Sequence, residues 1–501
     1  MSFSDDPARA GDGIGAPLLR REDRRFLTGR GRFLDDIDLP GALHCAFVRS
    51  PHAHARIDAI DANAARAMPG VSAVLTGADM EADGIGAMLC AWPIKWADGR
   101  DMPEPPRWAL ARGVVRHVGE PVAMVIAESR SAAVDAAEAI AIDWGELPAV
   151  SEAPKALLKG APRIHEEAVG NVCFHFRRGD TAATDAAFGT AAETVTLDLV
   201  NHRLACAAIE PRATAALWDP DRQALTLHTT TQTPHLIRRA VAEQLDLPES
   251  DLRVISPDVG GGFGMKGKHY PEETAVAWAA RKLGRLVRWS GDRSEAFVSD
   301  TQARDHHTRA ELALDADGRY LGLRVRTIAN VGAYVSTYGA AIPSAIYSGL
   351  LAGVYATPAI DIEITGVFTN SVPTDAYRGA GRPEACYVLE RLTDAAAAKL
   401  GIDRVELRRR NMIPAAAMPY TTPIGPTYDS GDFPRILEGA VKAADYAGFA
   451  ARRDKTADDG KLRGIGVAAF VESSGVAPSR LAGMMGARGG LFESAEIRVD
   501  A

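Results

Sequence analysis

Residues 258–269 read DVGGGFGMKGKH, with four glycines in five positions, and they follow the strand-like run LRVIS at 252–256. Glycine permits positive φ and carries no Cβ, so the backbone amides of such a loop can approach an anion or an oxo group closely. The pattern therefore predicts a loop that holds its main chain against a ligand. A tight turn into the following helix is the plainer alternative.

Two nucleotide-binding motifs match this loop only in part. Residues 262–267 satisfy G-x-G-x-x-G, but the next helix is predicted to begin at Pro271, too late to point its N-terminus at a pyrophosphate. Residues 262–268 satisfy G-x-x-x-x-G-K, but His269 replaces the Ser or Thr that would ligate magnesium. A nucleotide-binding enzyme that uses this loop stays an alternative function.

Two other loops carry polar residues between predicted elements. Residues 229–234 (TTTQTP) place Gln232 between a strand and a helix that begins at Pro234. Residues 373–383 (PTDAYRGAGRP) place Arg378 among small residues just before another helix. Arg378 is either a surface charge or a contact for a buried anion, and an isolated Gln at a strand end is most often a solvated amide.

Helix and strand patterns alternate along the chain, which predicts an α+β protein with mixed sheets and packed helices. Thr233 is expected to cap the helix that begins at Pro234, and glycines are expected to end the helices that begin near Pro271 and Pro383. A further helix is predicted at 129–140. Strands are predicted at 41–50, 120–128, 193–200, 213–217, 463–472 and 491–499.

The composition is that of a folded, globular chain. Hydrophobic residues make up 47% and charged residues 24% of the 501 residues. At roughly 100–200 residues per domain, the length allows about two to four domains. The net charge of −8 supplies no positive field for a phosphate backbone, which argues against nucleic acid as a partner. The charge-free stretch 327–360 contains prolines and polar residues, so no membrane span is predicted.

Cysteine usage and the N-terminus bear on redox centres and location. The cysteines form no C-x-x-C pair, so neither a zinc site nor an iron-sulfur cluster can form locally, and any such centre is expected on another chain. Their sparse, odd number indicates a reducing compartment. The N-terminus is acidic and no apolar run follows, so no signal peptide is predicted and the cytoplasm is expected. The cysteines are Cys45, Cys90, Cys173, Cys206 and Cys386.

Taken together, the three loops resemble a known family. TTTQTP, DVGGGFGMK and TDAYRGAGRPEA, in that order, are similar to the molybdenum-binding large subunit of the xanthine oxidase, aldehyde oxidase and aerobic carbon monoxide dehydrogenase family. Residues 20–33 (R-x-E-D-x-R-F-L-T-G-x-G-x-F), 47–57 (FVRSPHAHARI) and 119–128 (GEPVAMVIAE) resemble that family's N-terminal hammerhead domain. The resemblance covers essentially the whole chain.

Local changes in the sequence pattern and the resemblance together give a domain order. We expect an N-terminal arm at 1–19, an a/b hammerhead domain at 20–146 and a linker at 147–180. A first molybdopterin-binding domain is expected at 181–412 and an incomplete second one at 413–501.

The cofactor implied by the resemblance is molybdopterin carrying molybdenum, in its cytosine dinucleotide form. Gln232, Phe263 and Arg378 would form the environment of the molybdenum ligands, with Gln232 donating to an oxo group and Arg378 offering its charge. Ala380 would line the substrate pocket. The residues expected to contact the cofactor are Gly260, Gly261, Gly262, Phe263, Gly264, Lys266 and Gly379.

The reaction implied is hydroxylation of a small-molecule substrate at an electron-poor carbon, with water as the oxygen source. Electrons would pass to a [2Fe-2S] small subunit and an FAD-binding medium subunit, so a hetero-oligomer is expected. The family's general-base Glu occurs in a G-x-G-E context, which is absent after Arg382. This Glu is therefore expected beyond Ala501, and the chain alone is expected to be inactive. A catalytically incomplete fragment or scaffold subunit is the alternative.

Departures from the family pattern bear on the substrate. Carbon monoxide dehydrogenases carry A-Y-R-C, whose cysteine holds copper, and Gly379 stands at that position here. Purine hydroxylases carry a Glu and an aromatic residue where this sequence has Gly267 and Ala380. Aldehydes or other N-heterocycles are therefore preferred over carbon monoxide and purines.

Four histidines raise the question of a separate zinc or iron site. His52 and His54 are expected on one face of a strand, and His306 and His307 are adjacent. Because no third ligand is evident, polar positions in a sheet or loop are preferred.

Overall fold

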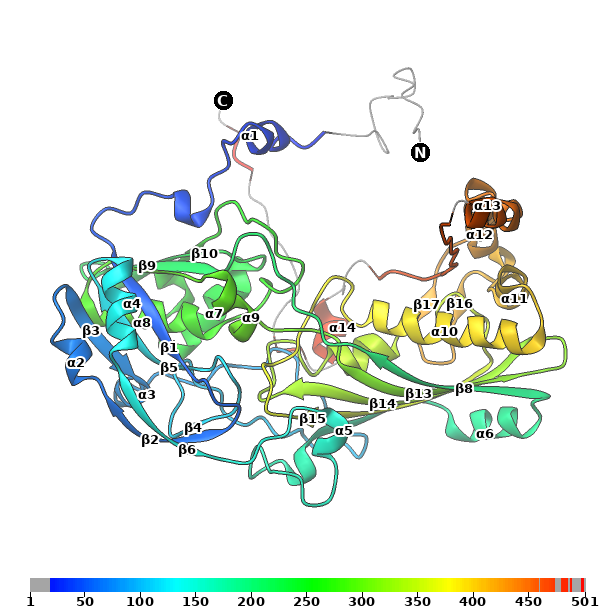
Figure 1. Cartoon of the computed structure of the whole chain (residues 1–501), viewed down its shortest axis with the longest axis horizontal. Coiled ribbons are helices and arrows are strands. Elements are labelled where there is room, and N and C mark those ends of the chain that lie inside the picture. Colours follow the sequence, from blue (N-terminus) through cyan, green and yellow to red (C-terminus); the bar gives the residue numbers. More distant parts are fainter. Residues whose placement is uncertain (1–18, 459, 474–478, 485–486, 489–496, 500–501) are drawn as a thin grey trace.

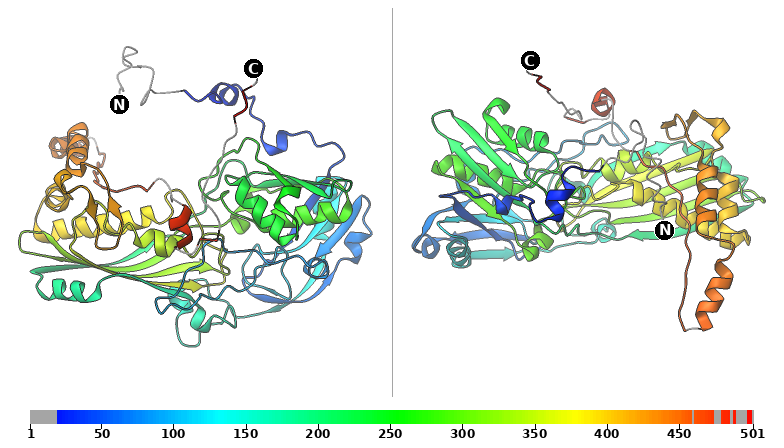
Figure 2. Two further views of the ribbon diagram at one scale, coloured as in Figure 1. Left: turned by 180° about the vertical axis from the view of Figure 1, so that it is seen from behind. Right: turned by 90° about the horizontal axis from the view of Figure 1, so that it is seen from above.

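The computed structural model describes residues 19–458, 460–473, 479–484, 487–488 and 497–499. The chain forms two halves that lie next to each other, each built on a sheet with helices packed against it (Figure 1). Views from behind and from above show the same arrangement (Figure 2). This mixture of sheets and packed helices confirms the predicted α+β class.

The first half is built on a seven-stranded sheet that joins distant parts of the sequence. Its strand order is β11-β10-β9-β12-β1-β5-β3. β1 pairs in parallel with β12 through Leu43 and Val287, so residues of the predicted hammerhead segment and of the following predicted domain share one sheet. The strands are β1 (Leu43–Arg49), β3 (Val71–Thr76), β5 (Pro121–Ala127), β9 (Ala213–Asp219), β10 (Ala224–Thr229), β11 (Leu252–Ile255) and β12 (Val287–Ser290).

Helices bury this sheet, and every residue of β5 is buried. α4 (Arg130–Glu138) packs on β1 and β5, α7 (Pro234–Gln244) on β11, and α8 (Pro271–Leu283) on β9 and β12. A smaller sheet of β2 (Ala55–Asp61), β4 (Val114–Val115) and β6 (Ala141–Glu146) lies nearby, together with α2 (Asn63–Arg66) and α3 (Gly77–Ala82).

The second half contains a five-stranded sheet in the order β7-β15-β14-β13-β8. α10 (Arg382–Leu400) covers one face, while α5 (Ala153–Ala156) and α6 (Thr181–Gly189) lie against the other (Figure 1). The main apolar core of this half lies between the sheet and α10. The strands are β7 (Val172–Gly179), β8 (Glu193–Asn201), β13 (His306–Leu314), β14 (Tyr320–Gly332) and β15 (Ala359–Phe368).

The remaining elements flank these two halves. α1 (Asp23–Leu27) stands off the first half, and α12 and α13 lie at the far end of the second (Figures 1 and 2). The other α-helices and strands are α9 (Arg293–Ser299), α11 (Arg404–Asn411), β16 (Tyr420–Thr421), β17 (Thr427–Tyr428), α12 (Phe433–Ala443), α13 (Phe449–Asp458) and α14 (Ser479–Met484). Among the described residues, none of the helices combines the length and apolar character needed to cross a bilayer.

Most helix ends follow the sequence signals. Gly284 and Gly401 end α8 and α10 in the left-handed conformation, and the Ser129 hydroxyl caps α4. The prediction that Thr233 caps α7 through its side chain is wrong, because its hydroxyl makes no capping bond. The Thr231 hydroxyl instead accepts a bond from the Thr233 backbone N–H.

Three predictions outside the helices differ from the structure or lie mostly outside its described residues. Residues 463–472 form no strand; Val467, Ala469 and Val471 alternate because they pack against the core of the second half. The proposed strand at 491–499 falls mostly outside the described residues, and 497–499 are not in a strand. Within the predicted linker at 147–180, the structure contains strand β7, which pairs with β15.

Buried ion pairs connect β1 to α8 within the first half. Glu272, at the second position of α8, accepts hydrogen bonds from Arg49 of β1 at 2.7 Å and from Arg212 at 2.6 Å. Arg212 also donates to Asp300 at 2.6 Å, and Arg49 to Glu295 at 2.7 Å. Because Glu272 is only 1% exposed, this network excludes water and fixes α8 against β1.

Glu272→Gln is expected to lower the free energy of unfolding by about 3–5 kcal/mol, because both arginines lose their shared carboxylate. Burial alone would raise the pKa of Glu272, but Arg212 and Arg49 outweigh burial and hold that pKa well below its usual range. The stabilisation is therefore present above a pH of about 4.3 and is lost as the pH falls. Urea unfolding of both proteins at pH 7 and in acid measures the difference, which should shrink in acid.

Glu166→Gln is the matched control, because the Arg163–Glu166 pair is largely exposed. Its effect should stay within about 0.5 kcal/mol. Equal losses from the two substitutions would contradict the importance of the buried network.

Candidate functional site

Two of the three loops singled out by the sequence meet because of sheet topology. β10 and β11 are parallel neighbours, so their carboxyl ends lie at the same edge of the sheet. The loop after β10 carries Gln232 and the loop after β11 carries residues 258–269. The backbone N–H of Gln232 donates to the Lys266 carbonyl at 2.9 Å, which joins the loops directly.

The glycines of the loop have no Cβ atoms, so other segments can approach its backbone closely. A Cβ on Gly262 would lie 2.5 Å from the Gln232 Cδ, and one on Gly264 would lie 3.0 Å from the Ala376 carbonyl oxygen. The Gly264 N–H donates to the Gln232 Oε1 at 2.9 Å. Glycine at 262 and 264 therefore lets the loop approach two other segments closely.

The third loop, which joins β15 to α10, reaches the same place. The Arg378 N–H donates to the Phe263 carbonyl at 2.9 Å, and the Arg378 guanidinium lies 5.5 Å from the centre of the Phe263 ring. Arg304 holds this loop from behind by donating to the Arg378 carbonyl at 2.9 Å. Gln232, Phe263 and Arg378, which were predicted to act together, thus form one cluster.

The cluster presents hydrogen-bond donors that the protein itself leaves unused. In the described part of the chain, the N–H groups of Gly261, Gly262 and Phe263 have no acceptor, and neither do the Gln232 side-chain NH₂ and the Arg378 guanidinium. The side chains of Gln232, Phe263 and Arg378 are exposed. Arg378 is therefore not a buried contact in this structure. Successive free amides next to a guanidinium form a site suited to an anionic or oxo-rich ligand.

The loops at 258–269 and 373–383 each hold a non-glycine residue in the left-handed region of φ. Phe263 has a φ of 52° and Ala380 a φ of 40°. Such conformations cost about 1–3 kcal/mol each and concentrate at functional sites. Gly379 and Ala380 form the turn between Arg378 and α10, where the Ala380 N–H donates to the Tyr377 carbonyl at 2.8 Å.

The lysines of the glycine-rich loop turn inward. Lys266 is fully buried at its side chain and binds Glu210 at 2.8 Å, and Lys268 binds Asp375 at 2.8 Å. Burial lowers the pKa of Lys266, although Glu210 opposes the shift. The Lys266 ammonium group is therefore paired with Glu210 inside the chain. Glu210 was not predicted, because it lies far from the loop in sequence and matches no local motif. Asp375 lies within the motif TDAYRGAGRPEA but was not singled out.

The N-terminal motif at 20–33 holds the start of the loop. Asp258 accepts a hydrogen bond from the Arg32 N–H at 2.7 Å and forms an ion pair with Arg25. These contacts hold Asp258, the first residue of the loop, in place from outside the loop.

Features needed for nucleotide binding are missing from the loop. The first turn of α8 is buried, and Glu273 accepts from the Tyr270 N–H at 3.0 Å, so this helix end does not face the free amides. His269 is buried and bonded to Thr274 at 2.8 Å, and burial lowers the pKa of His269 to about 3. A neutral, occupied His269 cannot replace the magnesium-binding hydroxyl.

The histidine pairs do not assemble a separate metal centre. His52 and His54 lie in a bend outside the strands, and His54 Nδ1 contacts the Pro148 carbonyl at 2.8 Å. His306 is buried in β13 against the Tyr347 ring. Throughout the described ranges, no group of three His, Cys, Asp or Glu side chains could hold a metal ion.

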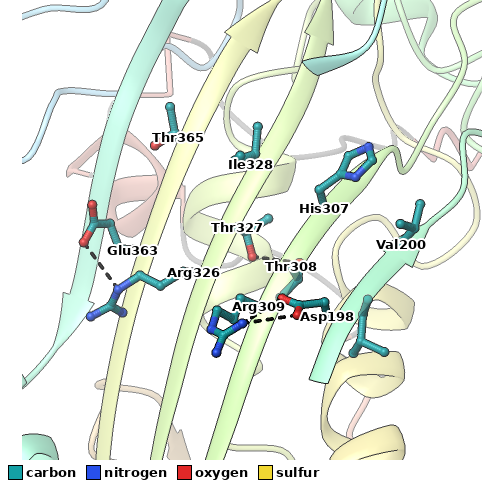
Figure 3. A pocket seen from close by; sticks show the side chains of 11 residues that line it. Asp198, Val200, His307, Thr308, Arg309, Arg326, Thr327, Ile328, Glu363 and Thr365 are labelled. Atoms are coloured by element: carbon teal, nitrogen blue, oxygen red, sulfur yellow. Dashed lines mark hydrogen bonds and ion pairs between the residues drawn. The ribbon is translucent and has the colours of Figure 1, made fainter. Parts of the chain in front are cut away.

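A groove of about 400 Å³ lies elsewhere, on one face of the five-stranded sheet (Figure 3). Its charges are mutually paired: Arg309 with Asp198 at 3.2 Å, and Arg326 with Glu363 at 3.5 Å. None of its lining residues belongs to the three loops. The groove therefore adds nothing to the cluster of Gln232, Phe263 and Arg378.

Two family models match most of the chain. Residues 28–148 match the aldehyde oxidase and xanthine dehydrogenase a/b hammerhead domain. Residues 164–412 match the molybdopterin cofactor-binding domain and include all three loops.

Individual proteins give the same result. The carbon monoxide dehydrogenase large chain of Hydrogenophaga pseudoflava is 38% identical, covering 96% of this chain and 60% of that protein. The nicotinate dehydrogenase large molybdopterin subunit of Eubacterium barkeri is 30% identical, covering 79% of this chain and 89% of that subunit. Quinoline 2-oxidoreductase from Pseudomonas putida 86 is 37% identical with a TM-score of 0.88, covering 94% of this chain and 59% of that one. The chain thus spans about three fifths of the first and third of these relatives.

We expect Gly262→Ala to displace the Gln232 side chain while leaving the fold intact, because that side chain can rotate away from the added Cβ. Losing the bond from the Gly264 N–H should cost about 1 kcal/mol of stability. It should also speed hydrogen exchange at Gly264 roughly fivefold. Urea unfolding and exchange measured by mass spectrometry check both effects.

Gly439→Ala provides the control, because Gly439 lies in α12 with open space around its Cβ position. This substitution should stabilise the protein by about 1 kcal/mol and leave exchange at Gly264 unchanged. An unaltered exchange rate at Gly264 in Gly262→Ala would contradict the proposed contact.

Proposed function

Because the chain belongs to the family of molybdenum-binding large subunits that includes xanthine oxidase, aldehyde oxidase and aerobic carbon monoxide dehydrogenase, we propose that it carries the molybdopterin site of a molybdenum hydroxylase. The observation that supports this most strongly is the convergence of free backbone amides at 261–263 with Gln232 and Arg378. The donors suit a cofactor rich in oxo and phosphate oxygens.

The residues of the three loops have distinct roles in this proposal. The Gln232 NH₂ donates to an oxygen of the metal centre, and the amides of Gly261, Gly262 and Phe263 bind its other acceptors. Phe263 excludes water from one side, and Arg378 offers positive charge to the cofactor or the substrate. When bound, the cofactor supplies oxidation of an electron-poor carbon with water as the oxygen source. Gly260, Gly264, Lys266 and Gly379 shape the binding loops.

For the substrate, we propose an N-heterocycle or an aldehyde. The names of the related quinoline 2-oxidoreductase and nicotinate dehydrogenase favour an N-heterocycle. Gly379 occupies the position where a copper-binding cysteine would be needed for carbon monoxide. Ala380, two residues after Arg378, would leave space for a ring in the substrate pocket.

The assembly proposed for this chain is a hetero-oligomer in the cytoplasm. A [2Fe-2S] small subunit and an FAD-binding medium subunit would accept the electrons, and the cofactor would be the cytosine dinucleotide form. We assign no general base within these 501 residues. A chain that binds the cofactor and both partner subunits but shows no turnover with them would fit the scaffold alternative.

Expression in a bacterial host that makes the cytosine dinucleotide cofactor tests the proposal. Mass spectrometric metal analysis of the purified chain should find about one molybdenum per chain. In the double variant Gln232→Ala and Arg378→Ala, the loss of two charge-assisted or oxo contacts should reduce retention of the metal at least about tenfold. The control is Arg309→Ala in the distant groove, which should retain the wild-type amount.

A folded wild-type chain without molybdenum would overturn the proposal. Stoichiometric binding of NAD or ATP to that metal-free chain would favour the nucleotide-binding alternative instead.

A further inference from the structure

Glu210 contacts both ends of the glycine-rich loop. Its Oε2 accepts a hydrogen bond from the Gly260 N–H at 2.7 Å and another from the Lys266 Nζ at 2.8 Å. Its own N–H donates to the Gly260 carbonyl at 3.0 Å. One carboxylate oxygen therefore ties together the two ends of the segment that presents the free amides.

The fit between Glu210 and Gly260 leaves no space for a side chain at 260. A Cβ on Gly260 would lie 2.4 Å from the Glu210 Cβ, an atom that cannot move without shifting the backbone. Gly262 and Gly264 lie against Gln232 and Ala376, whereas Gly260 is needed because it lies against Glu210.

The contact extends from Lys266 to Gln232. The Lys266 carbonyl accepts from the Gln232 N–H at 2.9 Å and from the Thr231 hydroxyl at 3.1 Å. The Lys266 side chain is fully buried, so Glu210 is the partner that balances its charge. Moving Lys266 would therefore move the backbone that positions Gln232.

Glu210 itself is anchored on both sides. Arg293 donates to the carbonyls of Ala208 and Ile209, the latter at 2.9 Å. Arg212, two residues after Glu210, belongs to the buried network around Glu272. The carboxylate thus projects from a fixed segment, and its side chain is 17% exposed.

We propose that Glu210 is a positioning residue that holds the 260–266 loop and Gln232 in the arrangement that receives the cofactor. The proposal rests on the molybdopterin function for the identity of the ligand. The clamp itself consists of contacts between this chain's own residues. Because Glu210 balances the charge of Lys266, Arg378 is the cation of the cluster that remains available to a ligand.

The test compares Glu210→Gln with a matched substitution elsewhere. Glu390→Gln removes the carboxylate that pairs with buried Arg408 between α10 and α11, away from the loop. Both variants of the full chain are expressed with the cofactor, and three quantities are measured: the thermal midpoint, molybdenum per chain, and hydrogen exchange at 260–266 in cofactor-free protein.

Glu210→Gln should speed exchange in the loop and lower molybdenum retention, each about tenfold, because a charge-assisted clamp is lost. Glu390→Gln should lower the thermal midpoint by a similar amount or more without changing either loop quantity. Adding Lys266→Met to Glu210→Gln removes the unpaired buried cation and should recover thermal stability, while molybdenum retention stays low.

The clamp is overturned if exchange at 260–266 is unchanged in Glu210→Gln, or if both variants lose molybdenum in proportion to their stability. A wild-type chain that binds no molybdenum would overturn the proposed function. In that case, faster loop exchange in Glu210→Gln would still support the clamp.

Discussion

The arrangement of the three loops depends on the absence of Cβ atoms along one short segment. Gly260, Gly262 and Gly264 each lie against a different part of the chain: Glu210, Gln232 and Ala376. A methyl group at any of these positions would overlap its neighbour or need strained backbone. Alternate glycines therefore let one loop contact three segments while its amides at 261–263 stay free for a ligand.

Features with local causes could be predicted from the sequence. Gly284 and Gly401 end helices because glycine adopts the left-handed conformation easily, and both do so here. The meeting of Gln232, Phe263 and Arg378 was also predicted, but through the resemblance to a family, since no spacing in the sequence links segments so far apart. The structure supplies the missing cause for two of them: β10 and β11 are parallel neighbours.

Features that depend on distant contacts could not be predicted. Glu210 binds a lysine 56 positions later, and neither residue has a local pattern that indicates the pair. Residues 463–472 alternate like a strand, yet their apolar side chains pack on a core, and in the described part of the chain they pair with no strand. Periodicity reports which side chains are buried, whereas strand pairing depends on a partner that the periodicity does not identify.

We propose that these loops surround a molybdenum centre. Anomalous X-ray scattering at the molybdenum K edge, from crystals of the cofactor-loaded chain, tests it most directly. We expect a single peak beside the amides of 261–263, with Gln232 and Arg378 around it. A molybdenum peak on any other surface of the chain would contradict it.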